Sequence, residues 1–396
     1  MSILLEEESG WFVNYKDYFD KIYKVCYDEN STECEFKLRS EFFRIKTPFV
    51  MKSHAIKVSK NLQDEQVPNA QKKKPKKRSK KRNEPLAETN LENRLIYEKV
   101  TNLIENARNL SILKSSEISA QEWFENNSEA REAAKGVLHL AIDNASPSKF
   151  HNNHNLSCIK TFGSEMYVIP PQSIFHLCDI GDIVNLKGYK YDLIVLDPPW
   201  ENKSVRRNKR YETLCCESLM SLPIEDLSHP GSLIVMWMTN NIRQLNYIKE
   251  VLFPKWKVYN PVTWHWVKIT EGGHLVHPID WHHKKPYENL MLGRVSESES
   301  SNSTNIKGIE QNKIILSIPS SIHSHKPPLV EILKPYIPED AKCLELFARY
   351  LLPNWTSLGN EAILQSIHFL MFGELVSSMF LLPSPMFYCF CLEKIP

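Results

Sequence analysis

The sequence predicts an α/β protein whose core is a parallel β-sheet, and short apolar stretches are the basis for this prediction. Residues Leu193–Leu196 form a branched apolar run that stops at two prolines. A run this short, rich in Ile and Val, is typical of a strand buried on both faces of a parallel sheet. Residues 231–238 are expected to form another buried strand and residues 342–349 a further strand, with a helix between them at residues 329–337.

The chain is organised around Asp197, Pro198, Pro199 and Trp200, which directly follow the first of these strands. Neither proline has an N–H to donate, so the hydrogen-bond ladder ends there. Pro198 also favours an extended backbone at Asp197. The tetrad is therefore expected to form a stiff loop at the carboxyl end of a central strand, where open α/β sheets bind their ligands.

This tetrad suits the transfer of a group to the exocyclic amine of a flat base. Adenine N6 is a poor nucleophile because its lone pair is delocalised into the ring. The Asp197 carboxylate and the Pro198 carbonyl can accept its two hydrogens and help to localise that pair. Trp200 can stack on the base and hold it for in-line attack, and a base inside a duplex must first be flipped out. The alternative is a strand that ends in a Pro-Pro turn with a buried tryptophan.

The overall composition is that of an ordinary globular protein. The chain has 396 residues, enough for one large domain or two smaller ones, and a net charge of +2. Its nine cysteines show no paired C-x-x-C pattern, so neither a zinc site nor a disulfide framework is predicted. The N-terminus lacks a basic region followed by a long apolar segment, so an intracellular protein without a secretory signal is expected.

Five regions are expected along the chain. Residues 1–60 are too aromatic for a disordered tail and are predicted to be a small ordered region that packs on the main domain, or alternatively binds nucleic acid. The other regions are a basic disordered linker at 61–90, a helical segment at 91–150, the catalytic domain at 151–361 and an apolar tail at 362–396.

The linker contains nine basic residues in a block of eleven that begins at Lys72 and ends at Arg82. Such a block repels itself and cannot bury surface. It predicts a nuclear import signal, a non-specific phosphate-binding arm, or both, with a solvated linker as the alternative. The expected location is the nucleus, with the cytoplasm or mitochondrion as alternatives.

The helical segment has apolar residues at approximate helical spacing, among them Leu91, Leu95 and Val100. A second helix is expected to begin after Ser119, because Ser119 and Glu122 match a capping box. No chemistry is visible here, and these helices are expected to brace the catalytic sheet.

Polar residues flank the tetrad on both sides. Asp179 follows an expected strand and can bind a ribose hydroxyl or an amino group, with a simple turn aspartate as the alternative. The segment after Trp200 suits phosphate contacts beside a stacking aromatic, with a solvated loop as the alternative. Its candidates are Lys203, Arg206, Arg207, Lys209, Arg210 and Tyr211.

Further strands are expected at residues 166–169, 256–268 and 287–294. No metal site is predicted, because the histidines follow no ligand spacing and two adjacent ones cannot face one site on a strand. The histidines considered are His265, His277, His282 and His283.

The last informative region offers partners for an amino-acid nucleoside. Lys326 lies in Ser-His-Lys-Pro-Pro, before the expected helix, and can hold a carboxylate. Glu345, Asn360 and Glu361 can accept hydrogen bonds from ribose hydroxyls. S-adenosylmethionine presents groups of both kinds.

Taken together, these motifs resemble those of the DPPW-type adenine-N6 methyltransferases, the family of the messenger-RNA adenosine methyltransferase. The resemblance covers about residues 158–361 and includes His325-Lys326-Pro327, LELFAR at 344–349 and Gly-Asn-Glu at 359–361. The chain looks most like the methyltransferase-like protein 4 branch, which has a basic N-terminal region and the sequence LELFAR. The catalytic element precedes the cofactor strand, which is the permuted order of the β class of amino-methyltransferases.

The resemblance implies a Rossmann-like sheet, S-adenosylmethionine as methyl donor, and a role for each matching residue. Asp197 would lie between the methionine amino group and the target N6, Lys326 would bind the methionine carboxylate, and Tyr211 would belong to a mobile loop that closes on the base. The other implied cofactor contacts are Asp179 and Ile180 at the adenine, and Glu345, Phe347, Arg349, Asn360 and Glu361 around the ribose.

The implied activity is N6-methylation of 2′-O-methyladenosine in small nuclear RNA, with adenine in DNA as the alternative substrate. The protein is expected to be a monomer that binds nucleic acid and does not bind a membrane. Two features depart from the family. Tyr350-Leu351 replaces a proline and a cofactor-contacting histidine. The apolar tail at 362–396 does not resemble the end of the family's proteins and is expected to weaken folding or solubility. A catalytically silent nucleic-acid-binding subunit or an inactive isoform is the alternative from another class.

Overall fold

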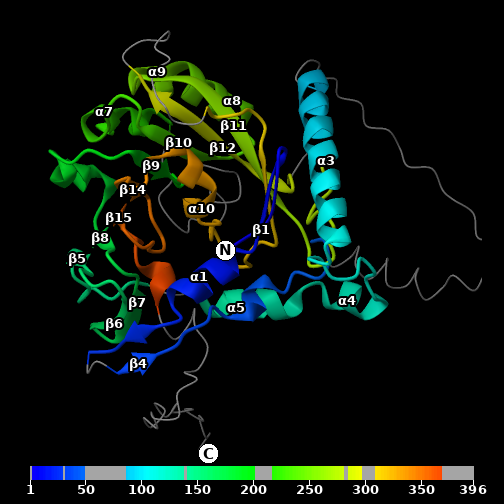
Figure 1. The fold of residues 1–396 in the computed structure, drawn as a ribbon, viewed down its shortest axis with the longest axis horizontal. Coiled ribbons are helices and arrows are strands. Elements are labelled where there is room, and N and C mark those ends of the chain that lie inside the picture. Colours follow the sequence, from blue (N-terminus) through cyan, green and yellow to red (C-terminus); the bar gives the residue numbers. More distant parts are fainter. Residues whose placement is uncertain are drawn as a thin grey trace, which may run out of the picture.

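One large β-sheet organises the protein (Figure 1). The computed structural model describes residues 2–29, 32–49, 86–137, 141–200, 216–280, 284–296 and 308–367. Among these residues the sheet has eleven strands. In spatial order they are β1 (Ile3–Glu7), β2 (Gly10–Val13), β13 (Ile314–Ser317), β11 (Val258–Lys268), β12 (Tyr287–Val295), β10 (Leu233–Met238), β9 (Leu193–Leu196), β14 (Cys343–Leu346), β15 (Trp355–Leu358), β8 (Ile174–His176) and β5 (Lys149–His151).

The middle of this sheet is parallel, which confirms the α/β prediction. Strands β10, β9, β14, β15 and β8 all run in the same direction. Every residue of β9, β10 and β14 is buried, which explains why β9 and β10 are continuous apolar runs rather than alternating ones, and β14 is apolar except for Glu345. Strand β12 is antiparallel to both of its neighbours. The arrangement is Rossmann-like.

The connections change direction between β9 and β14. After β9 the next strand of the sheet is β10 on one side, whereas after β14 it is β15 on the other side. Such a switch point leaves a crevice outside the carboxyl ends of the strands, where open α/β sheets bind ligands. Residues 197–200 follow β9 and residues 347–349 follow β14, so both stretches reach this crevice.

The N-terminal residues are built into both sheets of the protein. Strand β2 pairs in parallel with β13, and β1 pairs with β2. A side chain at Gly10 would come within 1.9 Å of the Ile314 carbonyl oxygen, so this pairing requires a glycine. The second sheet contains β4 (Glu33–Cys34), β3 (Cys26–Tyr27), β6 (Ser157–Phe162) and β7 (Glu165–Ile169). The described residues 2–29 and 32–49 therefore join the elements that follow, and the five predicted regional boundaries stay predictions.

Helix α3 (Leu86–Asn109) covers one end of the large sheet (Figure 1). Its buried side chains include Ile96, Val100 and Leu103, which pack on residues of β2, β11 and β13. The predicted apolar face was partly wrong, because Leu91 is 69% exposed and Leu95 is 36% exposed. The contact with the sheet selects the stripe through Ile96 and Val100, and the two leucines lie outside it.

The remaining helices are short. The capping box is confirmed, since Ser119 Oγ accepts from the Glu122 N–H at 3.2 Å and Glu122 Oε2 accepts from the Ser119 N–H at 2.9 Å. The helix predicted at 329–337 is shorter than expected, because Pro335 has no N–H and the chain continues as a 3-10 turn, Lys334–Tyr336. The other helices are α1 (Tyr15–Ile22), α4 (Ala120–Glu125), α5 (Ser128–Val137), α7 (Ile224–Leu227), α8 (Ile242–Tyr247), α9 (Phe253–Lys255) and α10 (Val330–Leu333).

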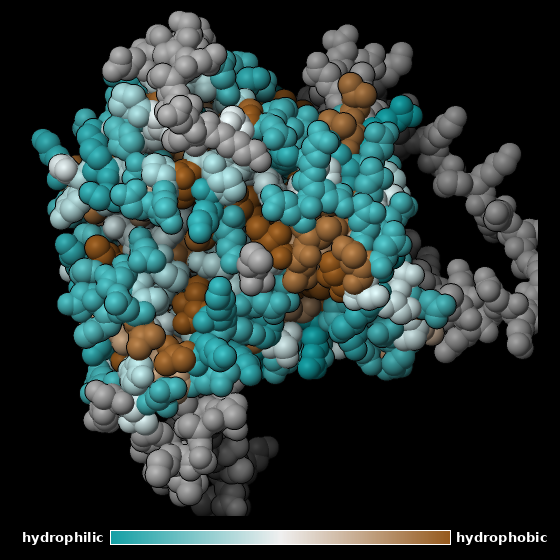
Figure 2. All heavy atoms as spheres, viewed as in Figure 1, coloured by the Kyte–Doolittle hydropathy of each residue, from teal (hydrophilic) through white to brown (hydrophobic). Residues whose placement is uncertain are grey.

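Apolar side chains are mostly inside the molecule. The face shown in Figure 2 is largely hydrophilic, with a hydrophobic patch near its centre. In the part of the chain that the structure describes, no helix is long and apolar enough to cross a membrane. The basic block at 72–82, residues 201–215, His282, His283 and residues 368–396 lie outside the described residues.

Leu103→Ala is expected to destabilise the protein by about 2–5 kcal/mol, because it leaves a cavity between α3 and the sheet where Leu103 is fully buried. Leu91→Ala, in the same helix but exposed, is the matched control and is expected to cost less than about 0.5 kcal/mol. Urea unfolding curves measure both values. Equal losses for the two variants would show that α3 is not docked as described.

Candidate active site

A cavity of about 670 Å³ lies at the carboxyl ends of the central strands. Its size is in the range of small-molecule and cofactor sites. Its wall is formed by residues from β10, β11 and β12, by the loop after β9 and by the segment before α10. The lining includes Asp197, Pro198, Pro199, Trp200, Asn240, Lys268, Glu288, His323, Lys326 and Arg349.

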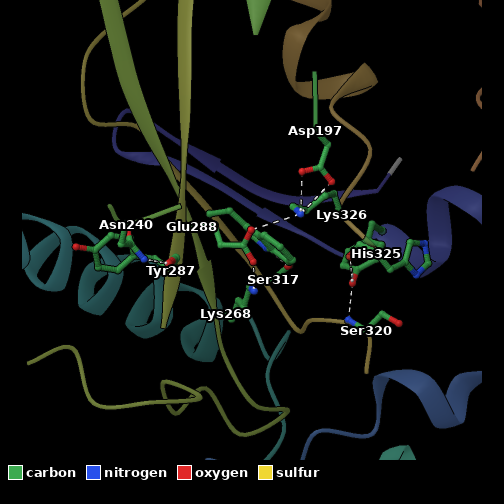
Figure 3. A network of polar contacts seen from close by, with 11 residues as sticks. Asp197, Asn240, Lys268, Tyr287, Glu288, Ser317, Ser320, His325 and Lys326 are labelled. Carbon is green, nitrogen blue, oxygen red and sulfur yellow. Dashed lines mark hydrogen bonds and ion pairs between the residues drawn. The ribbon is translucent and has the colours of Figure 1, made fainter. Parts of the chain in front are cut away.

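Lys326 and Asp197 form a buried ion pair in this cavity (Figure 3). Lys326 Nζ lies 3.2 Å from Asp197 Oδ1 and 3.0 Å from Oδ2, and its third acceptor is Glu288 Oε2 at 3.4 Å. Burial lowers the pKa of Lys326, but the two carboxylates outweigh burial and raise it above its usual value. Lys326 is therefore a fixed ammonium group.

Glu288 extends the pair into a row of alternating charges. It lies on β12 and also accepts a hydrogen bond from Lys268, at the end of β11. Burial would raise the pKa of Glu288, but Lys268 and Lys326 together hold it at about 2. Glu288 was not singled out from the sequence. The available signal was a glutamate near the start of an expected strand that is mostly apolar, since charged residues are rarely buried without a partner.

The tetrad after β9 is held firmly in place. Trp200 is only 6% exposed, and its Nε1–H donates to the Trp237 carbonyl at 2.8 Å. The Pro198 carbonyl accepts the Trp200 N–H at 2.8 Å and keeps a second lone pair. Trp200 is thus largely a buried side chain that also lines the cavity, and its stacking on a base stays a prediction.

The end of β14 presents a carboxyl group of a different kind. Glu345 is 6% exposed, and its Oε2 has no hydrogen-bond partner in the described structure. Burial, reinforced by the charge of Asp197, raises the pKa of Glu345 from 4.5 to about 8. Glu345 is therefore protonated at neutral pH and can donate as well as accept a hydrogen bond.

The chain turns sharply after Glu345. Phe347 has a φ of +62°, a conformation that costs energy for a residue other than glycine and is often found at functional sites. A side chain at Gly359 would come within 3.1 Å of the Ala348 N and O atoms, so the loops after β14 and β15 meet closely at this glycine.

The remaining predicted cofactor contacts lie on the same rim. Arg349 Nε pairs with Glu361 Oε2 at 3.0 Å. The Cys178 N–H donates to the Gly359 carbonyl at 3.4 Å, which joins the segment that leads into Asp179 and Ile180 to the segment that leads into Asn360. Asp179 Oδ1 accepts from the Gly181 N–H at 2.8 Å and caps a 3-10 helix, as its turn alternative predicts. The second carboxylate oxygen of Asp179 is not used in this cap. Its contact with a ribose hydroxyl or an amino group stays a prediction.

The predicted residues fall into three groups. Asp197, Pro198, Pro199, Trp200, Lys326 and Arg349 line one cavity. Glu345, Phe347, Asn360, Glu361, Asp179 and Ile180 belong to the neighbouring strand ends. Lys203, Arg206, Arg207, Lys209, Arg210 and Tyr211 lie outside the described residues. Within the described ranges, no group of three or more His, Cys, Asp or Glu residues could hold a metal ion.

Comparisons with known proteins place most of these site residues inside a family of methyltransferases. The MT-A70 family profile matches residues 191–361. The chain is 46% identical over 218 residues to the N(6)-adenine-specific methyltransferase METTL4 of Homo sapiens, which covers 54% of this chain and 46% of that protein. It is 34% identical over 281 residues to the DNA N6-methyl methyltransferase of Caenorhabditis elegans, covering 62% and 73%. It is 28% identical over 209 residues to the N6-methyladenosine RNA methyltransferase MTA1 of Pyricularia oryzae, covering 50% and 54%.

The chain belongs to the MT-A70 family. Within that family its similarity puts it in the METTL4 branch, and it spans about half the length of the human and mouse METTL4 relatives that it matches.

Glu345→Gln is expected to change how stability depends on pH. The folded protein holds a proton on Glu345 between pH 4.5 and about 8, whereas the unfolded chain has lost it. The free energy of unfolding of the parent protein should therefore fall as pH rises through this window. Glu345→Gln, which has no proton to lose, should lack this part of the slope.

Urea unfolding of the cofactor-free protein at pH 5, 6, 7 and 8 measures the difference. Glu339→Gln, at an exposed glutamate, is the matched control and should leave the slope unchanged. Parallel slopes for the parent and Glu345→Gln would contradict the assignment of a protonated Glu345.

Proposed function

We propose that the protein is an S-adenosylmethionine-dependent methyltransferase that modifies N6 of adenine in nucleic acid. The observation that carries this proposal is the Lys326–Asp197 ion pair at the switch point, inside a cavity that the tetrad lines. The printed names of the human, nematode and fungal relatives support the same reaction.

The residues at the strand ends fit S-adenosylmethionine. Glu345 keeps a buried oxygen without a partner, which suits a ribose hydroxyl. Lys326 would hold the methionine carboxylate, and Asp179 and Ile180 would meet the adenine. Phe347, Arg349, Asn360 and Glu361 would surround the ribose. When bound, the cofactor supplies an electrophilic methyl group on its sulfonium sulfur.

The tetrad would prepare the target amine. The Asp197 carboxylate can accept one N6 hydrogen, and the Pro198 carbonyl has a free lone pair for the other. These contacts favour a localised lone pair on N6, and Trp200 with the stiff prolines holds the base in place. Asp197 can then take the proton that N6 must lose. The Lys326 ammonium stabilises the Asp197 carboxylate before that transfer.

The proposed substrate is an exposed adenosine, with 2′-O-methyladenosine in small nuclear RNA as the first choice. The nematode relative's name favours DNA as the second candidate, and the N6 edge is the same in both. The basic residues at 203–210 and in the 72–82 block would attract the phosphate backbone, and the block would direct the protein to the nucleus. Action as a monomer without metal is part of the proposal. A silent subunit is disfavoured because Asp197 and Lys326 are both present and paired.

Asp197→Ala is expected to reduce methyl transfer by at least about 100-fold, the order found when a preorganised polar group is removed from an active site. Labelled S-adenosylmethionine should be incubated with 2′-O-methyladenosine RNA, plain RNA and single-stranded DNA of the same sequence. Asp226→Ala, at an exposed residue of α7, is the matched control and should keep the parent rate.

Label in the modified RNA alone would support the first-choice substrate, and label in DNA would replace it with the second. A folded parent protein that binds the cofactor and labels nothing would favour the silent subunit. An Asp197→Ala variant as active as the parent would refute the proposed role of the tetrad.

A further inference from the structure

We infer that the hydroxyl group of Tyr15, in the N-terminal segment, is a positioning group that holds the Lys326 loop in its active geometry. The Lys326 loop is defined here as residues 319–326, between β13 and α10. This inference deepens the proposed function and rests on it for the role of Lys326. Tyr15 does not itself line the cavity but contacts Ser320, which does, so its effect would pass through the loop.

The Lys326 loop needs an outside support. It contains no helix or strand, yet it forms one wall of the cavity and delivers the Lys326 ammonium group. A lysine side chain has many rotamers, so its position depends on how firmly its backbone is held. A displacement of about 1 Å at such a group is enough to cost a large part of an enzyme's rate.

One hydroxyl group contacts both ends of the loop. Tyr15 lies at the start of α1 and is 1% exposed. Its oxygen accepts a hydrogen bond from the Ser320 N–H, and its O–H points to the His325 carbonyl in a long contact of 3.5 Å. Ser320 and His325 bracket the loop, and His325 directly precedes Lys326.

Aromatic rings surround the residue next to Lys326. The His325 ring lies 5.5 Å from the rings of Tyr15 and Phe19, 6.3 Å from that of Phe43 and 5.6 Å from that of Tyr350, measured between centroids. Burial, with a smaller contribution from Lys326, lowers the pKa of His325 to about 3. His325 is therefore neutral at physiological pH.

The N-terminal segment holds this region at two further points. The Ser321 N–H donates to the Phe42 carbonyl at 2.7 Å. Both the N–H and the Oγ of Ser2 donate to Glu331 Oε2 at 2.6 Å, at the start of α10. The N-terminal segment therefore forms hydrogen bonds with the chain on both sides of Lys326. Of these contacts, the one made by the Tyr15 hydroxyl is nearest to Lys326 in sequence.

Tyr15→Phe tests the hydroxyl alone, because the ring and its packing remain. We expect it to weaken S-adenosylmethionine binding about tenfold, the equivalent of one well-placed polar contact, with little change in melting temperature. Tyr18→Phe is the matched control in the same helix and should bind the cofactor as the parent does. No hydrogen bond from Tyr18 to the Lys326 loop is seen among the described residues. Calorimetric titration measures the dissociation constants.

A double-mutant cycle separates positioning from general stabilisation. In a Lys326→Met background, Tyr15→Phe should cause no further loss of cofactor binding, because the group that it positions is gone. Additive losses, or parent-like binding by Tyr15→Phe, would overturn the inference.

Hydrogen exchange of the cofactor-free protein provides a readout that does not depend on function. Tyr15→Phe should speed exchange of the Ser320 amide, which loses its acceptor, whereas Tyr18→Phe should not. Unchanged exchange would overturn the inference even if no cofactor binds. Faster exchange in a parent protein that binds no S-adenosylmethionine would support the clamp on the loop and count against the proposed function.

Discussion

A buried ammonium group is the constraint on which this site depends. Lys326 is 6% exposed, and an unpaired charge at that depth costs several kcal/mol. Its partners come from separate parts of the sheet: Asp197 after β9 and Glu288 on β12. Lys268 completes an alternating row of charges. The geometry of the row therefore depends on the order and register of β9, β11 and β12.

The sheet also explains why two neighbouring carboxyl groups behave differently. Strands β9 and β14 are adjacent and parallel, so Asp197 and Glu345 both arrive at the switch point. Asp197 has an ammonium partner there, whereas one oxygen of Glu345 has none. Burial, reinforced by the negative charge of Asp197, raises the pKa of Glu345 to about 8, so Glu345 retains its proton at neutral pH. The crevice therefore contains one charged acceptor and one neutral donor.

The N-terminal segment is part of this machinery rather than an attachment to it. It supplies β1 and β2 to the large sheet, and it supports the loop that carries Lys326. Aromatic residues in its sequence indicated an ordered region, but they pack around His325 and not merely on the outside of the domain. Through His325, which precedes Lys326, these N-terminal residues are connected to the site although they are far from the tetrad in sequence.

Local sequence patterns predicted much of the fold. The runs that became β9 and β10 are apolar throughout, β14 is apolar except for Glu345, and the prolines of the tetrad end β9 because they have no N–H to donate. The face of α3 was misjudged because both possible stripes contain leucines, and only the sheet selects one. Strand β15 was not predicted, because its polar Thr356 and Ser357 break the apolar pattern.

The sequence by itself determined the tetrad, its place at a strand end, and the identity of the lysine and glutamates that could bind a nucleoside. These depend on neighbours a few residues away. Only the tertiary structure shows that Glu288 forms an ion pair with Lys326 and that the Tyr15 hydroxyl is hydrogen-bonded to the Lys326 loop. Asp197 and Lys326 are 129 residues apart, and Tyr15 and Ser320 are 305 residues apart. Contacts over such separations arise from strand order and register, which no local pattern contains.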